Sequence, residues 1–345
     1  MKKVSVAITA YNQADYVSQA VQSVLDQDYP NLEVIVSDNH STDHIQDVVE
    51  KYRGDPRFKY FRNESNLGMI GNFQRALCDY SAGDYALHLD GDDYLIDRTY
   101  IREAMELVER HDLVMVFAKS KTLYDKSGFI VEDKVNSDLP MLMDGDWFFL
   151  NFYRGYSLAT LTVIHDRRRA MEVGLFQKNI ISTDWEGLLK LMIGHRIGFM
   201  NRFAGVWRRH GENETMKIDL PRLLANLEYI ESPYQYALEQ SRFPREILDR
   251  WRQRMLRRYF VKILSMAMIL KDNPLRIEIL NYLKKYDRKA YRSLMADVRF
   301  HAFALAAKNR PLLYFIFKHI LKQESFIRDF DYIRPGKSKD RKDRE

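Results

Sequence analysis

Three carboxylates occur within four positions at the point where an apolar run ends. The run Tyr85–Leu89 is followed by Asp90, Gly91, Asp92 and Asp93. Carboxylates this close repel one another unless a cation or basic groups neutralise them. Hard divalent ions such as Mg²⁺ and Mn²⁺ take oxygen ligands and complete their shells with water or phosphate oxygens. The cluster therefore indicates a metal site that binds a diphosphate. The alternative is a solvated turn, in which Asp and Gly are common.

Strands and helices alternate through the part of the chain that positions these acids. Short apolar runs rich in β-branched residues predict strands at 3–10, 32–37, 58–61 and 85–89, and apolar residues at helical spacing lie between them. This order predicts β-α-β units and a mainly parallel sheet whose polar loops gather at one edge. Three loops should meet there: the turn Thr9–Asn12, the loop that begins at Asp38, and the acidic cluster.

The pattern changes along the chain. Further strands are predicted at Leu113–Ala118, Leu158–His165 and around Ile197–Asn201, and Asp184 lies near a helix N-terminus. After about residue 216 the strand signals give way to long amphipathic patterns. We expect an α/β domain over residues 1–216, divided into a first half (1–95) and a second half (96–216). A helical region (217–334) and a charged tail (335–345), expected to be disordered, follow.

Composition narrows the classes of protein to which the chain could belong. Of the 345 residues 46% are apolar, and there is no run of about 18 apolar residues that suggests a membrane span. The only cysteine is Cys78, which fits a reducing compartment, so a cytoplasmic location is expected. The net charge is +6, with basic residues concentrated near the C-terminus. Segment 311–322 is amphipathic and either lies on an anionic membrane surface or packs on the α/β domain.

Taken in order, several short motifs resemble those of the family 2 glycosyltransferases. These enzymes have the GT-A fold, a Rossmann-like sheet with flanking helices, and use nucleotide-activated sugars. The ordered set is specific, although no single motif is decisive. The matching motifs are Val4–Asn12, Gln27–Asp38, Ser41–Asp43, Asn66–Gly68, Leu89–Asp93, Thr183–Glu186 and Trp207–His210. The resemblance implies that residues 1–95 form the nucleotide-binding half of the domain and residues 96–216 its acceptor half. The helical remainder lies outside the resemblance.

The resemblance implies a role for each matching residue. Asp92 is the main metal ligand, aided by Asp90, Asp93 and His210, and the ion is Mn²⁺ or Mg²⁺. Asp38 accepts a hydrogen bond from the pyrimidine N3–H, which a carboxylate can do because it is an acceptor only. Arg208 pairs with phosphate. The nucleotide pocket is lined by Thr9, Ala10, Tyr11, Asn12, Asn66, Gly68 and Asp90.

Asp184 matches the family's general base. A carboxylate suits this role because it can take the proton of the acceptor hydroxyl as that oxygen attacks the anomeric carbon. The alternative is an acid that only interacts with the helix dipole. The chain departs from the family pattern at three positions: Thr183 replaces the usual Glu, Asn39 replaces a second acid, and His40 replaces a common Gly.

The expected function is inverting, metal-dependent transfer of a hexosyl or related sugar from a UDP-sugar, or a dTDP-sugar, to a glycan or polyprenyl-linked acceptor in surface polysaccharide synthesis. We expect no nucleic-acid partner. Peripheral membrane contact through the C-terminal helices is left open. One rival is a sugar nucleotidyltransferase, but such enzymes carry a Gly- and Arg-rich loop where this chain has Thr9–Asn12. The other rival is a non-catalytic nucleotide-sugar-binding subunit of an envelope assembly.

Overall fold

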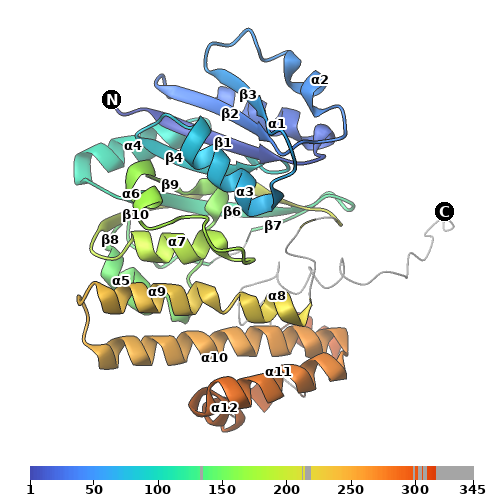
Figure 1. Cartoon of the computed structure of the whole chain (residues 1–345), viewed down its shortest axis with the longest axis vertical. Coiled ribbons are helices and arrows are strands. Elements are labelled where there is room, and N and C mark those ends of the chain that lie inside the picture. The colour runs from blue at the N-terminus through green and yellow to red at the C-terminus, as the bar shows by residue number, and fades with distance from the viewer. Residues whose placement is uncertain are drawn as a thin grey trace, which may run out of the picture.

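The computed structural model describes residues 1–132, 135–211, 213, 219–297, 300–301, 305 and 309–315. Its first part is a parallel sheet with helices on its faces, coloured blue in Figure 1. The strands are β1 (Val4–Ala10), β2 (Leu32–Asp38), β3 (Phe58–Arg62) and β4 (Tyr85–Asp90), in the order β3-β2-β1-β4. The helices are α1 (Ala14–Leu25), α2 (Ile45–Glu50) and α3 (Gly68–Gln74), which continues as a π-helix over Arg75–Tyr80.

The second part continues the same sheet with both antiparallel and parallel neighbours, β6 and β10 being parallel. From β4 the order runs β9-β6-β10-β5, and β9 is antiparallel to both β4 and β6. The predicted α/β fold with flanking helices is confirmed, but the sheet is mixed rather than mainly parallel, because β5, β7, β8 and β9 pair in antiparallel fashion. The strands are β5 (Tyr94–Leu95), β6 (Met115–Tyr124), β7 (Phe129–Val131), β8 (Leu142–Asp144), β9 (Ile164–Asp166) and β10 (Arg196–Arg209). The helices are α4 (Tyr100–His111), α5 (Gly145–Asn151), α6 (Arg167–Glu172) and α7 (Thr183–Leu191), with 3₁₀ turns at Phe152–Arg154 and Thr160–Thr162.

The strand predicted over Leu158–His165 is wrong for most of its length. Only Ile164 and His165 belong to β9, and a 3₁₀ turn precedes them. The reason is the buried hydroxyl of Thr162, which accepts from the N–H of Ala118 at 3.1 Å and lies 2.7 Å from the carbonyl of Ala159. A side chain thus takes over hydrogen bonds that a strand backbone would have made.

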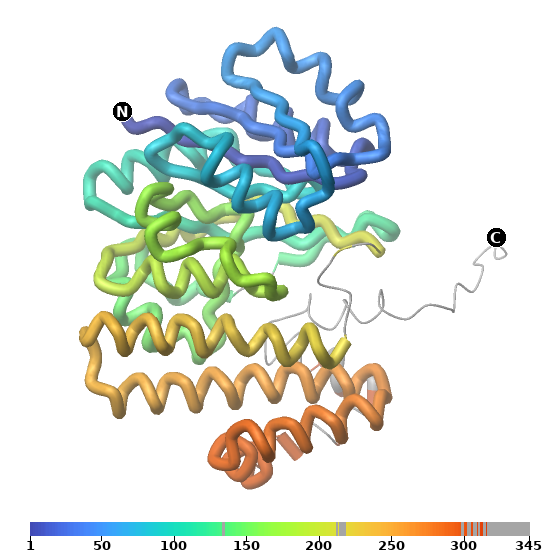
Figure 2. The backbone as a smooth tube through the Cα atoms, viewed as in Figure 1, coloured from blue at the N-terminus to red at the C-terminus, as the bar shows by residue number. Residues whose placement is uncertain are grey.

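Helices that follow residue 219 stack beneath the sheet, in the lower part of Figures 1 and 2. Buried side chains of α9, α10 and α11 share one apolar cluster with α5 and α7. Trp251 of α10, for example, donates from Nε1 to the carbonyl of Phe149 in α5 at 2.7 Å. The helices are α8 (Leu220–Ala225), α9 (Glu228–Glu239), α10 (Arg245–Leu270), α11 (Asn273–Tyr286), α12 (Arg288–Met295) and α14 (Arg310–Phe315).

Parts of the predicted domain layout fall outside the described residues. These are residues 214–218, next to the predicted boundary, and the tail 335–345; of the amphipathic segment 311–322 only 311–315 are described. The division at residue 216 therefore stays a prediction. Among the helices within the described ranges, none combines the length and the apolar character that a membrane crossing needs.

Candidate active site

A pocket of about 1040 Å³ lies where the carboxyl ends of β1 and β4 approach the N-terminus of α7. Parallel strands place the loops at their carboxyl ends along one edge, which is where such sheets bind ligands. The predicted site residues line the pocket with two exceptions, Asp38 and Arg208. Those that line it are Thr9, Ala10, Tyr11, Asn12, Asn66, Gly68, Asp90, Asp92, Asp93, Asp184 and His210.

The loop after β1 is joined to the loop after β2 by Asn12. Asn12 has a left-handed φ of 53°, which Asn tolerates better than most residues. Its backbone N–H donates to Ser41 Oγ at 3.0 Å, and its Oδ1 accepts from the N–H of Thr42 at 2.8 Å. The neighbouring Tyr11 is 46% exposed at the pocket, so its ring is available to stack on a planar base.

Asp38 lies at the end of β2 but does not line the pocket. The side chain is buried, with Oδ1 accepting from the N–H of Ser41 at 2.9 Å and Oδ2 accepting from the hydroxyl of Tyr60 at 2.6 Å. The next residue, Asn39, does line the pocket, and its Oδ1 accepts from the N–H of Leu67 at 2.9 Å. The structure therefore shows Asp38 ordering its own loop, and its contact with a pyrimidine base stays a prediction.

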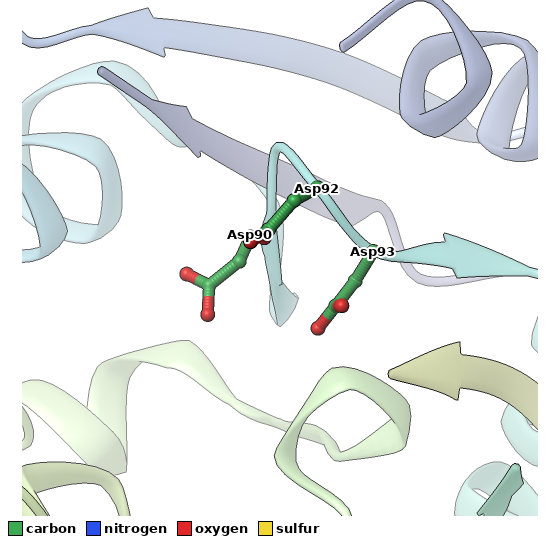
Figure 3. Close-up of side chains that lie close together, drawn as sticks. All are labelled: Asp90, Asp92 and Asp93. Carbon is green, nitrogen blue, oxygen red and sulfur yellow. The ribbon is translucent and has the colours of Figure 1, made fainter. Parts of the chain in front are cut away.

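The three acids project from the end of β4, which is Asp90, and from the tight turn between β4 and β5 (Figure 3). The backbone N–H of Asp93 donates to the carbonyl of Asp90 at 3.0 Å and closes this turn. Ligand atoms of Asp90, Asp92 and Asp93 all lie within 4.8 Å of one another. Asp92 and Asp93 are buried, whereas the Asp90 side chain is 47% exposed. Several carboxylate oxygens at this spacing are the donor set that Mg²⁺ and Mn²⁺ prefer, so the residues fit a divalent cation.

Burial and repulsion raise the pKa of two of these acids. Burial is the largest cause for Asp93, and the charges of Asp92 and Asp90 raise its pKa further. Burial also raises the pKa of Asp92, while its hydrogen bond with His210 opposes that rise and the charge of Asp90 adds to it. The ionised turn is therefore unfavourable by itself, and a cation bound there would relieve the repulsion.

His210 reaches the acidic turn from the residue after β10. Its Nε2 lies 2.6 Å from Oδ2 of Asp92, and Nδ2 of Asn213 donates to the same oxygen at 3.3 Å. The imidazole also stacks on Tyr16, with ring centroids 5.2 Å apart. These contacts place the R-x-H motif beside the acids, and the assignment of His210 as a metal ligand stays a prediction.

Arg208 supports the acidic turn from outside the pocket. Its backbone N–H donates to Oδ1 of Asp93 at 2.8 Å, and its Nε donates to the carbonyl of Asp92 at 2.9 Å. The guanidinium also pairs with Asp125 at 2.7 Å. The structure does not bring Arg208 to the pocket wall, so this geometry supports a bracing role rather than the predicted phosphate contact. The following residue, Arg209, lines the pocket instead.

Asp184 is held at the N-terminus of α7. Its Oδ1 accepts from the N–H of Trp185 at 2.7 Å, and Nε1 of Trp185 donates to the carbonyl of Leu158 at 3.0 Å. Burial raises the pKa of Asp184; the hydrogen bond from Trp185 opposes the rise, and the charge of Asp90 adds to it. A carboxylate with a raised pKa is a stronger base, which suits proton abstraction from a hydroxyl.

Sequence reasoning missed His88, which contacts Asp90 from within β4. Nε2 of His88 lies 3.1 Å from Oδ1 of Asp90. The imidazole is enclosed by the rings of Phe73 and Phe176, at centroid distances of 4.1 and 5.0 Å. The available signal was a histidine inside an otherwise apolar strand, since a buried polar ring needs a partner.

Sequence reasoning also missed the wall that the C-terminal helices add to the pocket. Asn226, just after α8, accepts from the N–H of Ser182 at 2.7 Å and donates to Ser182 Oγ at 3.2 Å. This pair joins the helices to the segment that precedes Asp184. The other residues of this wall are Leu223, Tyr259, Lys262, Ile263 and Met266. Their helical spacing marks a buried helix face, and it gave no indication of what that face covers.

The model of a known family, Glycosyl transferase family 2, matches residues 5–171. Residues 5–171 thus form a glycosyl transferase family 2 domain. The match includes the acidic turn and nearly all of the strands β1 to β4, so it confirms the resemblance for the motifs up to Leu89–Asp93. The motifs Thr183–Glu186 and Trp207–His210 lie beyond the matched residues.

Curated relatives match the chain over part of their length. TarS, the poly(ribitol-phosphate) beta-N-acetylglucosaminyltransferase of Staphylococcus aureus, is 32% identical over 123 residues, which are 35% of this chain and 21% of TarS. WfaP of Escherichia coli, named UDP-Glc:alpha-D-GlcNAc-diphosphoundecaprenol beta-1,3-glucosyltransferase, is 33% identical over 131 residues, 38% of this chain and 50% of WfaP. The match thus spans between a fifth and a half of these relatives.

Solved structures show the same fold. A crystal structure of S. aureus TarS 1–349 in complex with UDP has a TM-score of 0.63 at 19% identity, over 95% of this chain and 91% of that one. The mannosyltransferase PcManGT from Pyrobaculum calidifontis, in complex with GDP-Man and Mn²⁺, has a TM-score of 0.53 at 15% identity. This match covers 95% of this chain and 85% of PcManGT. Because 95% of the chain is matched, the likeness includes helices after residue 219 as well as the GT-A-like sheet.

Proposed function

We propose that this protein is an inverting, metal-dependent glycosyltransferase. It transfers a sugar from a UDP-sugar, with a dTDP-sugar as the alternative, to a hydroxyl of a glycan or polyprenyl-linked glycan in surface polysaccharide synthesis. The observation that carries the proposal is one pocket lined both by the acidic turn and by Asp184, whose raised pKa suits a base. Glycosyl transfer needs both parts, because the leaving diphosphate must be stabilised and the acceptor hydroxyl must lose a proton.

The donor would occupy the side of the pocket formed by the loops after β1, β2 and β4. Tyr11 would stack on the base, and the loop Asn66–Gly68, fixed by hydrogen bonds to Asn39, would complete this side. UDP as the nucleotide is supported by TarS, a relative with the same fold that has been solved with UDP.

The catalytic roles follow from the positions of the acids. Asp90, Asp92, Asp93 and His210 would hold Mn²⁺ or Mg²⁺, which neutralises the charge that develops on the departing diphosphate. Asp184 accepts the proton of the acceptor hydroxyl while that oxygen attacks the anomeric carbon from the face opposite the leaving group. Asp184 cannot swing freely, because the N–H of Trp185 holds one of its oxygens.

The acceptor class is inferred from relatives. The names of TarS and WfaP specify poly(ribitol-phosphate) and a diphosphoundecaprenol-linked sugar as their acceptors. We accordingly place the reaction in the cytoplasm, at the inner face of the cell membrane, where polyprenyl-linked glycans and nucleotide sugars meet.

A thermal-shift panel of UDP-, dTDP- and GDP-sugars, with and without Mn²⁺, tests the proposal, because ligands that bind the native state raise its melting temperature. We expect a UDP-sugar to stabilise the protein more with Mn²⁺ than without, and to be turned over with release of UDP. Release of pyrophosphate from a nucleoside triphosphate and a sugar phosphate would instead establish a nucleotidyltransferase. If nucleotide sugars bind but are neither transferred nor hydrolysed with any donor and acceptor tested, the result would instead establish a non-catalytic binding protein.

A further inference from the structure

The helix that carries the candidate base is tied to the C-terminal helices on both sides of that residue. Ser182 precedes Asp184, and its N–H donates to Oδ1 of Asn226 at 2.7 Å. In return, Nδ2 of Asn226 donates to Oγ of Ser182 at 3.2 Å. Glu186 follows Asp184 and accepts from the hydroxyl of Ser232 in α9, which lies against α7 (Figure 1). The C-terminal helices therefore hold the first turn of α7 at two points.

The link through Asn226 reaches the pocket, whereas the link through Ser232 does not. Asn226 is buried, and it lines the pocket together with Ser182 and Asp184. Glu186 is fully buried away from the pocket and is also paired with Lys190 at 2.7 Å. Asn226 is therefore the residue through which the C-terminal helices hold α7 next to the reacting groups.

Ser182 determines where α7 begins. It comes directly before the first residue of α7, and its carbonyl accepts from the N–H of Glu186 at 3.0 Å. The carboxylate of Asp184 is fixed to the same turn by the N–H of Trp185. A shift of Ser182 would therefore move the turn and the carboxylate together, because both are bonded within it.

Asn226 is itself held in one place and one orientation. Its N–H donates to the carbonyl of Arg222 in α8 at 3.0 Å. Helix α8 is fastened to α10 by the buried hydroxyl of Tyr259, which donates to the carbonyl of Leu223 at 2.6 Å. Turning the side-chain amide over would set its NH₂ group against the N–H of Ser182, and two donors cannot bond to each other. Asn226 is thus a fixed point for the start of α7.

We infer that Asn226 is a positioning residue for the candidate base: by fixing Ser182, it sets the position of Asp184 relative to the bound donor. This inference rests on the proposed function and gives the C-terminal helices a part in it. The donor side is formed by the loops after β1, β2 and β4 together with Asn66–Gly68, so a change at Asn226 acts on the attacking group and leaves donor binding intact.

Kinetics of Asn226→Ala test the inference. UDP release is measured from the UDP-sugar that stabilises the protein most in the thermal-shift panel, with water in place of the acceptor, and calorimetry measures the Kd for UDP with Mn²⁺. We expect kcat to fall roughly tenfold to a hundredfold, because misplacing a reacting group by about 1 Å has a cost of this size. The KM for the UDP-sugar and the Kd for UDP should not change.

The conservative variant Asn226→Asp should recover most of the rate. One carboxylate oxygen can accept from the N–H of Ser182, and the other can accept from its hydroxyl. The limiting rates at high pH are compared, because Asp184 is ionised there in spite of the added negative charge. If Asn226→Ala does not fold, Asn226→Ser replaces it in every measurement, since its hydroxyl lies too close to the backbone to keep both bonds.

A double variant separates positioning from general damage to the fold. Asn226→Ala is combined with Asp184→Asn, which removes the base whose position is in question. We expect no more than about a twofold further loss of UDP release, because two changes that act through one group are not additive. General damage would instead lower the rate by the same factor whether or not Asp184 is present.

Ser232→Ala is the matched control. It also removes a buried hydrogen bond between α7 and the C-terminal helices, but Glu186 keeps its ion pair with Lys190, and Ser232 does not line the pocket. Urea unfolding should show lower stability for this variant, as for Asn226→Ala, because both lose a buried hydrogen bond. The kcat of Ser232→Ala should stay close to that of the original protein.

The possible failures are distinguishable. Absence of UDP binding, or full activity of Asp184→Asn, would refute the proposed function. If UDP binds normally and Asp184→Asn is inactive, an unchanged kcat in Asn226→Ala would overturn only this inference. Equal losses from Asn226→Ala with and without Asp184, or an equal loss of kcat in Ser232→Ala, would also overturn it, because either result would show a structural effect that is not directed at the base.

Discussion

Nε2 of His210 lies 2.6 Å from Oδ2 of Asp92, although 118 positions separate the two residues in the sequence. The contact joins the end of the longest strand, β10, to the turn after β4. Its partner Asp92 has a pKa that burial raises and that this hydrogen bond lowers. His210 therefore helps to keep Asp92 ionised, which is the state that a metal ligand requires.

Substitution of Asp92 by Asn should abolish metal-dependent transfer. The amide keeps the shape of the side chain but removes the charge that a divalent ion needs, so we expect kcat to fall about a thousandfold, as for the loss of other strong electrostatic contacts. UDP release as a function of Mn²⁺ concentration measures the effect. Asp79→Asn, at an exposed position, is the matched control. A variant Asp92→Asn with full activity and the original Mn²⁺ dependence would exclude Asp92 as a ligand.

Asp184→Asn should separate catalysis from donor binding. We expect kcat to fall about a thousandfold, within the usual range for loss of a general base, while the Kd for UDP stays unchanged. The base must be ionised, and burial raises its pKa above the ordinary 3.8, so activity should rise with pH through a midpoint above that value. Measurement of the transfer rate between pH 4 and pH 8 shows whether activity rises with pH as expected. Activity that falls as pH rises through this range would contradict the assignment.

The first four strands and the acidic cluster could be predicted because their signals are local. Each strand is a short apolar run that ends in polar residues, and β1, β2 and β4 end within a residue or two of the predicted positions. Once strands and helices alternate, topology requires the loops to meet at one edge. The order of the family motifs then assigned Asp184 and His210 to the same site, although neither is close to the acids in sequence.

Which of two consecutive residues faces the pocket could not be predicted. Asp38 and Asn39 are adjacent, and successive side chains of an extended chain point to opposite sides. The left-handed φ of 63° at His40 helps to set this loop, and such a φ is uncommon for a residue other than Gly. The position of Arg208 could not be predicted for a similar reason. Val206 pairs with Tyr94 of β5, and this register places Arg208 behind the acids. Both outcomes depend on tertiary pairing.

Gly91 is needed in the acidic turn for reasons of space. A Cβ atom at this position would lie 2.6 Å from Oε1 of Gln13, 3.1 Å from Cβ of Ala10 and 3.2 Å from the carbonyl oxygen of Thr9. The Gln13 side chain can move, but the other two contacts belong to the end of β1. We expect Gly91→Ala to destabilise the fold by about 1–3 kcal/mol, as overpacking usually does, and to reduce activity by displacing the acids.

Gly54→Ala is the control for this substitution, because a Cβ atom at Gly54 meets nothing within 4 Å. Urea unfolding and UDP release should both be normal in that variant. Adding Gln13→Ala to Gly91→Ala removes the shortest of the three contacts, so part of the stability should return. If Gly91→Ala matched the original protein in both measurements, the turn would have more room than the structure shows.

Glu33 should make the stability of the sheet depend on pH. Burial alone would raise its pKa, but hydrogen bonds from Lys3, Ser5, Ala82 and Lys59 outweigh burial and lower the pKa from 4.5 to about 2. The lowered pKa means that Glu33 stabilises the fold fully above pH 4.5 and loses this effect as pH falls towards 2. The shift corresponds to about 3 kcal/mol. Glu33→Gln should therefore lower the free energy of unfolding by roughly that amount at pH 7.

The pH dependence distinguishes this charge effect from simple loss of packing. Urea unfolding of the original protein and of Glu33→Gln should differ by the same free energy at pH 7 and pH 6, and by less than half as much at pH 3, where folding gains less from ionising Glu33. Glu50→Gln, at an exposed position, should show little difference at any of these pH values. A difference between Glu33→Gln and the original protein that stayed constant down to pH 3 would show that the ionised carboxylate is not what stabilises this part of the sheet.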